Sequence, residues 1–146
     1  MPVKYLYLDF DGVLHPNSFE KGKAFCLMPL LELALNGSDV RIVVSSSWRH
    51  HETQAYIQSL FPASIRSLLS GFTGEPLVGR WGRWNEISNH AALHGVTEWR
   101  ALDDAVSEFP PDCPNLISCE GHIGLQEFQV NLLRKWIKGS SINNGN

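Results

Sequence analysis

The N-terminal run of the chain resembles a strand that ends in acids, and this feature limits the possible folds more than any other. Residues 3–10, VKYLYLDF, are rich in aromatic and branched side chains, as is typical of a strand buried on both faces of a parallel sheet. Asp9 and Asp11 stand two residues apart at its end, so their side chains share one face. Two carboxylates that close repel each other unless a cation or a shared proton compensates. The pair therefore predicts a functional site at a strand tip.

The composition is ordinary for a globular protein. The chain has 146 residues, of which 43% are hydrophobic and 18% charged, and this length is enough to bury a core. We expect a single domain over residues 1–138 and a disordered tail over residues 139–146.

Charge, hydropathy and cysteine content bear on the partners and the cellular location to expect. The formal net charge of -3 gives no overall attraction to nucleic acid or to an anionic membrane. No apolar run reaches the roughly 20 residues that span a bilayer, so we expect no membrane partner. The three cysteines are an odd number, which favours reduced thiols and a cytoplasmic location.

Strand and helix patterns alternate along the rest of the chain. Further strands are predicted at residues 39–47, 98–105 and 114–119. Helices are predicted at residues 28–37, 49–61, 83–95 and 124–139, and residues 63–82 are expected to be irregular and turn-rich. The last helix has apolar residues at helical spacing, which are Leu125, Phe128, Leu132 and Trp136. This alternation predicts an α/β fold: a Rossmann-like three-layer α/β/α sandwich with a mainly parallel central sheet.

Polar side chains end each of the three strong strands. Besides Asp9 and Asp11, the run Ser45, Ser46 and Ser47 ends the second strand, and a pair of acids, Asp103 and Asp104, ends the third. Ligands of such sheets bind beyond the carboxyl ends of the strands, where these groups would meet. Several carboxylates in one crevice favour a hard cation such as Mg²⁺, and serine hydroxyls with helix N–H groups suit phosphate oxygens.

These strand ends resemble the motifs of the haloacid dehalogenase (HAD) superfamily. DFDGVLH is similar to its first motif, DxDG(V/T), RIVVSS to its second, and RALDDA to its fourth, in the family's order and over about residues 3–137. The resemblance implies that Asp9 is the nucleophile that forms an aspartyl-phosphate. It also implies that Asp11 is the general acid and then the general base, that Ser45 holds a phosphoryl oxygen, and that Ser46 offers its backbone N–H.

The resemblance also implies a Mg²⁺ site and a basic residue. Asp9, the backbone carbonyl of Asp11, and Asp104 or Asp103 would hold the ion. The family's third motif is a Lys or Arg on or just before a helix, and we favour Arg83, which leads into the helix at 83–95, with Arg80 as the alternative.

Other residues around the crevice are candidates for substrate contact or for packing. Gly12, Arg49 and Arg80 are further candidate substrate contacts. His15 could touch the substrate or merely close its loop. For Trp48 and Arg49 we favour packing and the surface over substrate contact, although Arg49 is expected near the rim of the crevice.

Asp11 and the short connections indicate the kind of HAD protein. Members with an acid two residues after the nucleophile are phosphatases and phosphomutases, because an alkoxide leaving group needs a proton. Residues 14–27 and 63–82 are too short to form a cap domain over the site. The chain looks closest to the small capless domains that accompany RNA-repair enzymes. We therefore expect a Mg²⁺-dependent phosphatase that acts on a phosphorylated macromolecule, with a nucleic-acid end as the candidate substrate.

Two alternatives of other classes stay open at this stage. One is a catalytically silent binding module on the same fold. The other is a receiver-like signalling domain that is phosphorylated on an aspartate. A receiver has its phosphorylated Asp at the end of the third strand and its acidic pair after the first, and the order of polar strand ends in this chain disfavours it.

Overall fold

A five-stranded parallel sheet forms the centre of the computed structural model, which describes residues 2–20 and 22–139. The strands run in the order β3-β2-β1-β4-β5, and every pair is parallel. Their bounds are β1 Lys4–Leu8, β2 Arg41–Val44, β3 Leu69–Phe72, β4 Glu98–Asp103 and β5 Leu116–Ser118.

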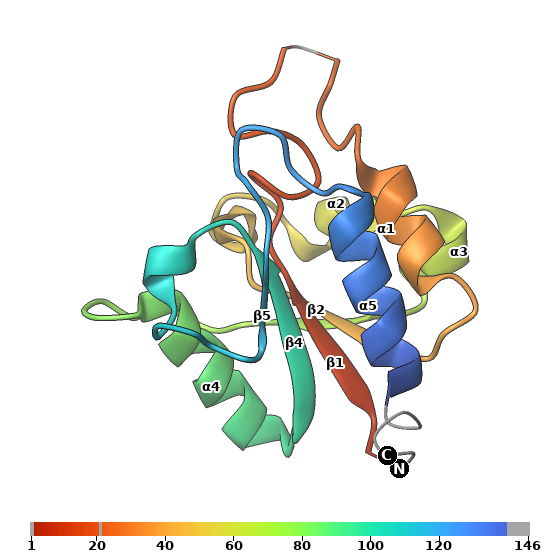
Figure 1. The fold of residues 1–146 in the computed structure, drawn as a ribbon. Helices are drawn as coiled ribbons and strands as arrows, with labels where there is room; N and C mark the ends of the chain where they lie inside the picture. Colours follow the sequence, from red (N-terminus) through yellow and green to blue (C-terminus); the bar gives the residue numbers. More distant parts are fainter. Residues whose placement is uncertain (1, 21, 140–146) are drawn as a thin grey trace.

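Helices cover both faces of this sheet (Figure 1). The α-helices are α1 Met28–Leu35, α2 Gln54–Ser59, α3 Ala63–Arg66, α4 Gly82–His94 and α5 Glu127–Gly139, and the 3₁₀ segments are η1 Ser47–His50 and η2 Val106–Glu108. Figure 1 shows α1 and α5 on one side of the sheet and α4 on the other. The expected Rossmann-like α/β fold with a mainly parallel sheet is confirmed.

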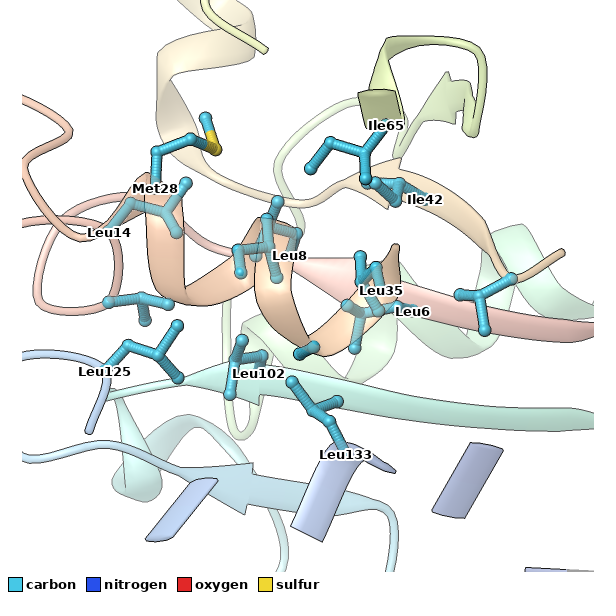
Figure 2. Packing of buried hydrophobic residues seen from close by; sticks show 14 of the residues in the cluster. Leu6, Leu8, Leu14, Met28, Leu35, Ile42, Ile65, Leu102, Leu125 and Leu133 are labelled. Carbon is cyan, nitrogen blue, oxygen red and sulfur yellow. The ribbon is translucent and has the colours of Figure 1, made fainter. Parts of the chain in front are cut away.

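The alternation of side chains along the strands divides the core into two apolar clusters. Leu6 and Leu8 of β1 face the larger cluster, which includes residues of α1 and α5 such as Leu35 and Leu133 (Figure 2). Tyr7, between them in sequence, points to the opposite face and joins Ile87 of α4. Because β1 is buried on both faces, its sequence is apolar without a break, as expected for the centre of a parallel sheet.

The strand order places the candidate site. The chain leaves β1 in one direction to form β2 and β3, then returns to the other side of β1 for β4 and β5. The winding direction therefore reverses between β1 and β4, and the crevice beyond their carboxyl ends is the usual ligand site of such a sheet.

Two secondary-structure predictions in the middle of the chain were wrong. Residues 63–82, expected to be irregular, contain α3 and the edge strand β3. The β3 sequence LSGF has only four residues and includes a glycine, so it gives little strand signal. Residues 49–61 do not form one helix, because Thr53 is extended and its side chain caps α2 by accepting a hydrogen bond from the Tyr56 N–H at 3.1 Å.

The predicted apolar face of the last helix was also partly wrong. Phe128 is 68% exposed, whereas Val130 and Leu133 are buried together with Trp136. Gln129 is buried on this face because its side chain donates to the Ser118 carbonyl at 3.1 Å and accepts the Gln126 N–H at 2.9 Å. The buried face of α5 therefore differs from the predicted one at Phe128, and it includes a polar residue that an apolar pattern does not reveal.

The cysteines, the helices and the C-terminal residues bear on the other expectations. Cys26, Cys113 and Cys119 are free thiols. None of the helices in residues 2–20 and 22–139 combines the length and apolarity that crossing a bilayer requires. Of the tail expected at residues 139–146, Gly139 belongs to α5, and residues 140–146 lie outside the described residues.

Candidate active site at the ends of β1 and β4

Three carboxylates meet at the carboxyl edge of the sheet. Leu8 of β1 pairs with Leu102 of β4, so the next residues, Asp9 and Asp103, lie side by side at the strand ends. Asp9, Asp103 and Asp104 each offer an oxygen within 4.8 Å of the others, the spacing of a metal-binding group. Asp9 and Asp103 are buried and Asp104 is half-buried.

Arg83, from the first turn of α4, supplies positive charge to this cluster. Its Nη1 lies 2.5 Å from Oδ2 of Asp103 and 3.5 Å from Oδ1 of Asp9. Burial opposes the charge on Arg83, but the neighbouring carboxylates, Asp103 first, outweigh this effect and raise the pKa of the guanidinium. Arg83 therefore stays a cation inside the crevice.

Burial dominates the electrostatics of the acids themselves. It raises the pKa of Asp9 well above the ordinary range, and the charge of Asp103 adds to this effect while Arg83 opposes it. The pKa of Asp103 is also raised by burial, against the lowering effect of Arg83. Three acids thus share one arginine, and a bound cation would favour their ionised forms.

A buried hydroxyl without a partner lies at the end of β2. The Oγ of Ser45 is inaccessible to solvent and has no hydrogen-bond partner in the described residues. An unsatisfied buried hydroxyl costs about 1–3 kcal/mol, so it is retained only where something compensates. A ligand oxygen would satisfy it. The Oγ1 of Thr73, just after β3, is also buried without a hydrogen-bond partner in the described residues.

Gly12 leaves room for an acid and does not offer its N–H to a ligand. Its φ is +79°, and a Cβ at this position would overlap the carboxylate of Asp104. The Gly12 N–H already donates to the carbonyl of His15 at 2.9 Å. The expected substrate contact at Gly12 is therefore not supported by the geometry.

The carboxylate of Asp11 contacts two ring N–H groups. Its Oδ1 accepts a hydrogen bond from Nε2 of His15 at 2.7 Å. Nε1 of Trp48 lies 3.2 Å from Oδ1 and 3.1 Å from Oδ2. The Asp11 side chain is 46% exposed, so it is open to solvent on its remaining side. Its carboxylate is not part of the metal-binding group, which leaves only the backbone carbonyl for the metal role expected of this residue.

Arg49, expected to contact the substrate, points into the protein. Its Nη1 donates to the carbonyls of Ser45 and Ser46 at 2.6 and 3.0 Å, and its Nη2 donates to Oε1 of Glu86 at 2.8 Å. Nη2 and Nε also bond the carbonyls that follow β3, those of Gly74 and Thr73. All five N–H groups of the guanidinium thus have protein acceptors, and its side chain is only 4% exposed. The geometry does not support a substrate contact for Arg49 and fits the packing role, because Arg49 fastens β2, β3 and α4 together.

A family model for HAD domains in Swiss Army Knife RNA repair proteins matches residues 5–130 of the chain. The protein belongs to this HAD family. Searches of curated proteins and of solved structures found no match. The resemblance seen in the three strand-end motifs is confirmed, and membership of the family sets the receiver-like alternative aside.

The structure distinguishes the two arginines considered for the third HAD motif. Arg83 reaches Asp9 and Asp103, whereas Arg80 is exposed and lies over the ring of Trp81, 4.6 Å from its centroid. Trp81, the residue before α4, has left-handed backbone torsions with a φ of 58°. The helix that starts after it directs Arg83 toward the strand ends. The geometry therefore places Arg83 in the crevice and Arg80 outside it.

The Ser46 side chain caps the segment that follows β2. It is fully buried, and its Oγ accepts the backbone N–H of Trp48 at 3.2 Å, which caps η1. This cap helps to set the indole against Asp11.

Glu86 is a buried acid next to the site that the sequence analysis missed. It is buried on α4, accepts a hydrogen bond from Arg49 and another from the Leu77 N–H at 3.1 Å, and lies 3.9 Å from Nε of Arg83. The sequence did contain a signal for a buried acid here. Glu86 is four residues before His90 and next to Ile87, which places it on the buried face of α4. An acid on such a face needs a buried partner.

The role of Arg49 leads to a stability prediction. We expect Arg49→Ala to lower the free energy of unfolding by about 3–5 kcal/mol, because Glu86 would lose its nearest charge partner and three strand-end carbonyls would lose their donor inside the protein. Arg80→Ala, at an exposed position, should change it by no more than about 0.5 kcal/mol. Urea unfolding followed by circular dichroism measures both. Equal stability of the two variants would contradict the assignment of Arg49 to the protein interior.

Proposed function

We propose that the protein is a Mg²⁺-dependent phosphomonoester hydrolase that works through an aspartyl-phosphate on Asp9. One observation carries the proposal: at the switch point of the sheet, Asp9 lies beside two further acids and the cation Arg83, and Ser45, whose hydroxyl has no partner in the described residues, ends the neighbouring strand β2. A nucleophilic carboxylate, a metal-binding group and donors for phosphoryl oxygens are the parts that phosphoryl transfer needs. The HAD family membership supports a hydrolase of this type.

The residues of the cluster fit a hard divalent cation. All of the donors are carboxylate or carbonyl oxygens, which suit Mg²⁺ and not a softer metal. Both oxygens of Asp103 already have protein donors, Arg83 on Oδ2 and the Ala105 N–H on Oδ1 at 2.9 Å. We therefore assign Asp9, Asp104 and the Asp11 carbonyl as the direct ligands, with Asp103 holding Arg83. When bound, Mg²⁺ would neutralise charge on the carboxylates and the phosphoryl group.

The protein residues then perform two displacements. The Asp9 carboxylate attacks phosphorus, the bond to the ester oxygen breaks, and Asp11 gives its proton to that oxygen. Water next attacks the aspartyl-phosphate while Asp11 takes back a proton, which releases phosphate and restores Asp9. Arg83 and the Ser45 hydroxyl bind phosphoryl oxygens through both steps.

For the substrate we propose a phosphorylated nucleic-acid end. The family description refers to RNA repair, which supports this class. A cap domain is not expected over the site, and a larger substrate would then supply binding energy from the surface around it. Arg80 over Trp81, outside the crevice, is a cation and ring pair that could meet a backbone phosphate and a base. Of the arginines expected at the rim, Arg80 keeps this role, because Arg49 is buried.

The nucleophile assignment predicts a specific loss. Asp9→Asn should reduce phosphate release by about 10³-fold or more, because the amide cannot attack phosphorus. Asp39→Asn, an exposed change that precedes β2, is the matched control and should keep the wild-type rate. Phosphate release and circular dichroism are measured together. A folded Asp9→Asn enzyme within tenfold of the wild type would overturn the assignment.

The metal-binding group predicts dependence on a divalent cation. Activity should disappear in excess chelator and return with added Mg²⁺. Thermal melting should also respond, because the buried carboxylates repel each other without the ion. We expect added Mg²⁺ to raise the melting temperature of the wild type but to raise that of Asp104→Asn much less. Full activity in chelator contradicts the proposal.

The substrate class predicts an order of efficiency. The kcat/KM for oligonucleotides with a terminal phosphate should exceed that for free mononucleotides and sugar phosphates. Arg80→Ala should raise KM for the oligonucleotide and flatten its dependence on salt, because one phosphate contact is lost. A free metabolite hydrolysed near 10⁶ M⁻¹s⁻¹, within the range of efficient enzymes, would favour a small-molecule phosphatase instead.

A further inference from the structure

Asp11 is held by a pair of side chains from two different parts of the chain. His15 lies four residues further along the loop that follows β1, and Trp48 belongs to η1 after β2. Both present a ring N–H to the same carboxylate, His15 at 2.7 Å and Trp48 at 3.1–3.2 Å. The proposed phosphatase chemistry uses Asp11 but gives neither ring a role.

The surroundings of His15 fix which of its nitrogens carries the proton. The ring is fully buried, and its Nδ1 accepts the backbone N–H of Phe25 at 3.0 Å. An imidazole nitrogen that accepts a hydrogen bond has no proton, so in the neutral ring the proton is on Nε2. His15 is therefore a fixed donor toward Oδ1 of Asp11. The rings of Phe19 and Phe25 pack against it, with centroids 4.1 and 4.9 Å away, and restrict its orientation.

Trp48 is fixed just as closely. Its backbone N–H donates a hydrogen bond to Oγ of Ser46. Its ring contacts Phe10 and Phe25 at centroid distances of 5.8 and 5.1 Å. An indole N–H can only donate, so this group can only favour an acceptor oxygen at Asp11. Two donors from rigid rings thus hold a carboxylate that is otherwise 46% exposed.

We propose that His15 and Trp48 are positioning residues that orient Asp11 for proton transfer and reserve its Oδ2 for the transferred proton. This inference rests on the proposed function. Oδ1 accepts the short bond from His15 and a second contact from Trp48, whereas Oδ2 has only the Trp48 contact. In the first step Asp9 bonds to phosphorus, the P–O bond to the ester oxygen breaks, and Oδ2–H gives its proton to that oxygen. In the second step the oxygen of the attacking water bonds to phosphorus, the bond between phosphorus and Asp9 breaks, and Oδ2 takes a proton from that water.

The test uses two leaving groups, because only a poor one needs the proton of Asp11. We compare a phosphorylated oligonucleotide with p-nitrophenyl phosphate. The sugar oxygen of the oligonucleotide would leave as an alkoxide, which needs a proton, whereas the nitrophenolate leaves without one. Trp48→Phe keeps the ring and removes the N–H. It should lower kcat for the oligonucleotide roughly tenfold more than for the aryl ester. His15→Leu should behave similarly, and His15→Gln, which restores an N–H donor, should recover part of the difference.

Trp136→Phe is the matched control. Trp136 also donates its indole N–H to a carboxylate, Oε2 of Glu98 at 2.7 Å, but Glu98 begins β4 at the opposite end of the sheet from the site. This variant loses the same kind of bond and should leave the ratio between the two substrates unchanged. An equal loss on both substrates in Trp48→Phe would overturn the proposal, because it would indicate only a structural role.

Nuclear magnetic resonance separates this inference from the proposed function. In isotope-labelled wild-type protein, His15 should have its proton on Nε2, and Asp11→Ala should shift the Nε1–H signal of Trp48 but not that of Trp136. If the wild type hydrolyses neither substrate, the proposed function fails, and these signals alone still decide whether the two rings hold Asp11. A proton on Nδ1 of His15, or an unmoved Trp48 signal, would refute the arrangement.

Discussion

The pairing of β1 with β4 is the constraint on which the rest of the site depends. In-register parallel pairing sets Leu8 opposite Leu102 and so brings Asp9 against Asp103 at the strand ends. Burial makes this proximity costly, because each carboxylate loses water and faces another negative charge. The fold tolerates the arrangement because Arg83 reaches both acids from α4. The same partly compensated charge is what lets the crevice take a cation and a phosphate.

A second layer of contacts holds the parts of the site at fixed distances. Arg49 connects the carbonyls after β2 and β3 to Glu86, and Glu86 in turn lies near Arg83. The ends of three elements are therefore tied by one buried guanidinium that never needs to meet a ligand. Such a rigid frame suits phosphoryl transfer, where catalysis depends on positioning more than on covalent chemistry.

Aromatic rings provide a different kind of support around Asp11. The loop after β1 and the segment after β2 meet through His15, Phe25 and Trp48, whose rings lie 4.9–6.0 Å apart by centroid. Packing of this kind fixes side-chain orientation at little cost in rotamer entropy, since each ring has only two side-chain torsions. The half-exposed acid of the proposed reaction thereby gains the order of a buried residue while staying open to a leaving group.

Much of the fold and part of the site could be predicted from the sequence because the signals are local. The unbroken apolar run before Asp9 indicated a central parallel strand, and the polar residues after three strands indicated where a ligand binds. Elements with weak local signals were predicted wrongly. The strand β3 was missed because it is short and contains glycine, and the buried face of α5 was partly misplaced because it includes the polar Gln129.

The sequence by itself determined which residues stand at the strand tips, since alternation along a strand and the spacing of Asp9 and Asp11 require no knowledge of other elements. Only the tertiary structure decided what each basic or aromatic residue does. Arg83 enters the crevice while Arg80 stays outside and Arg49 turns inward, because the phase of α4 and the path of the segment after β2 set these directions. Hydrogen bonds such as that from Trp48 to Asp11 join residues 37 positions apart, and no local pattern encodes that distance.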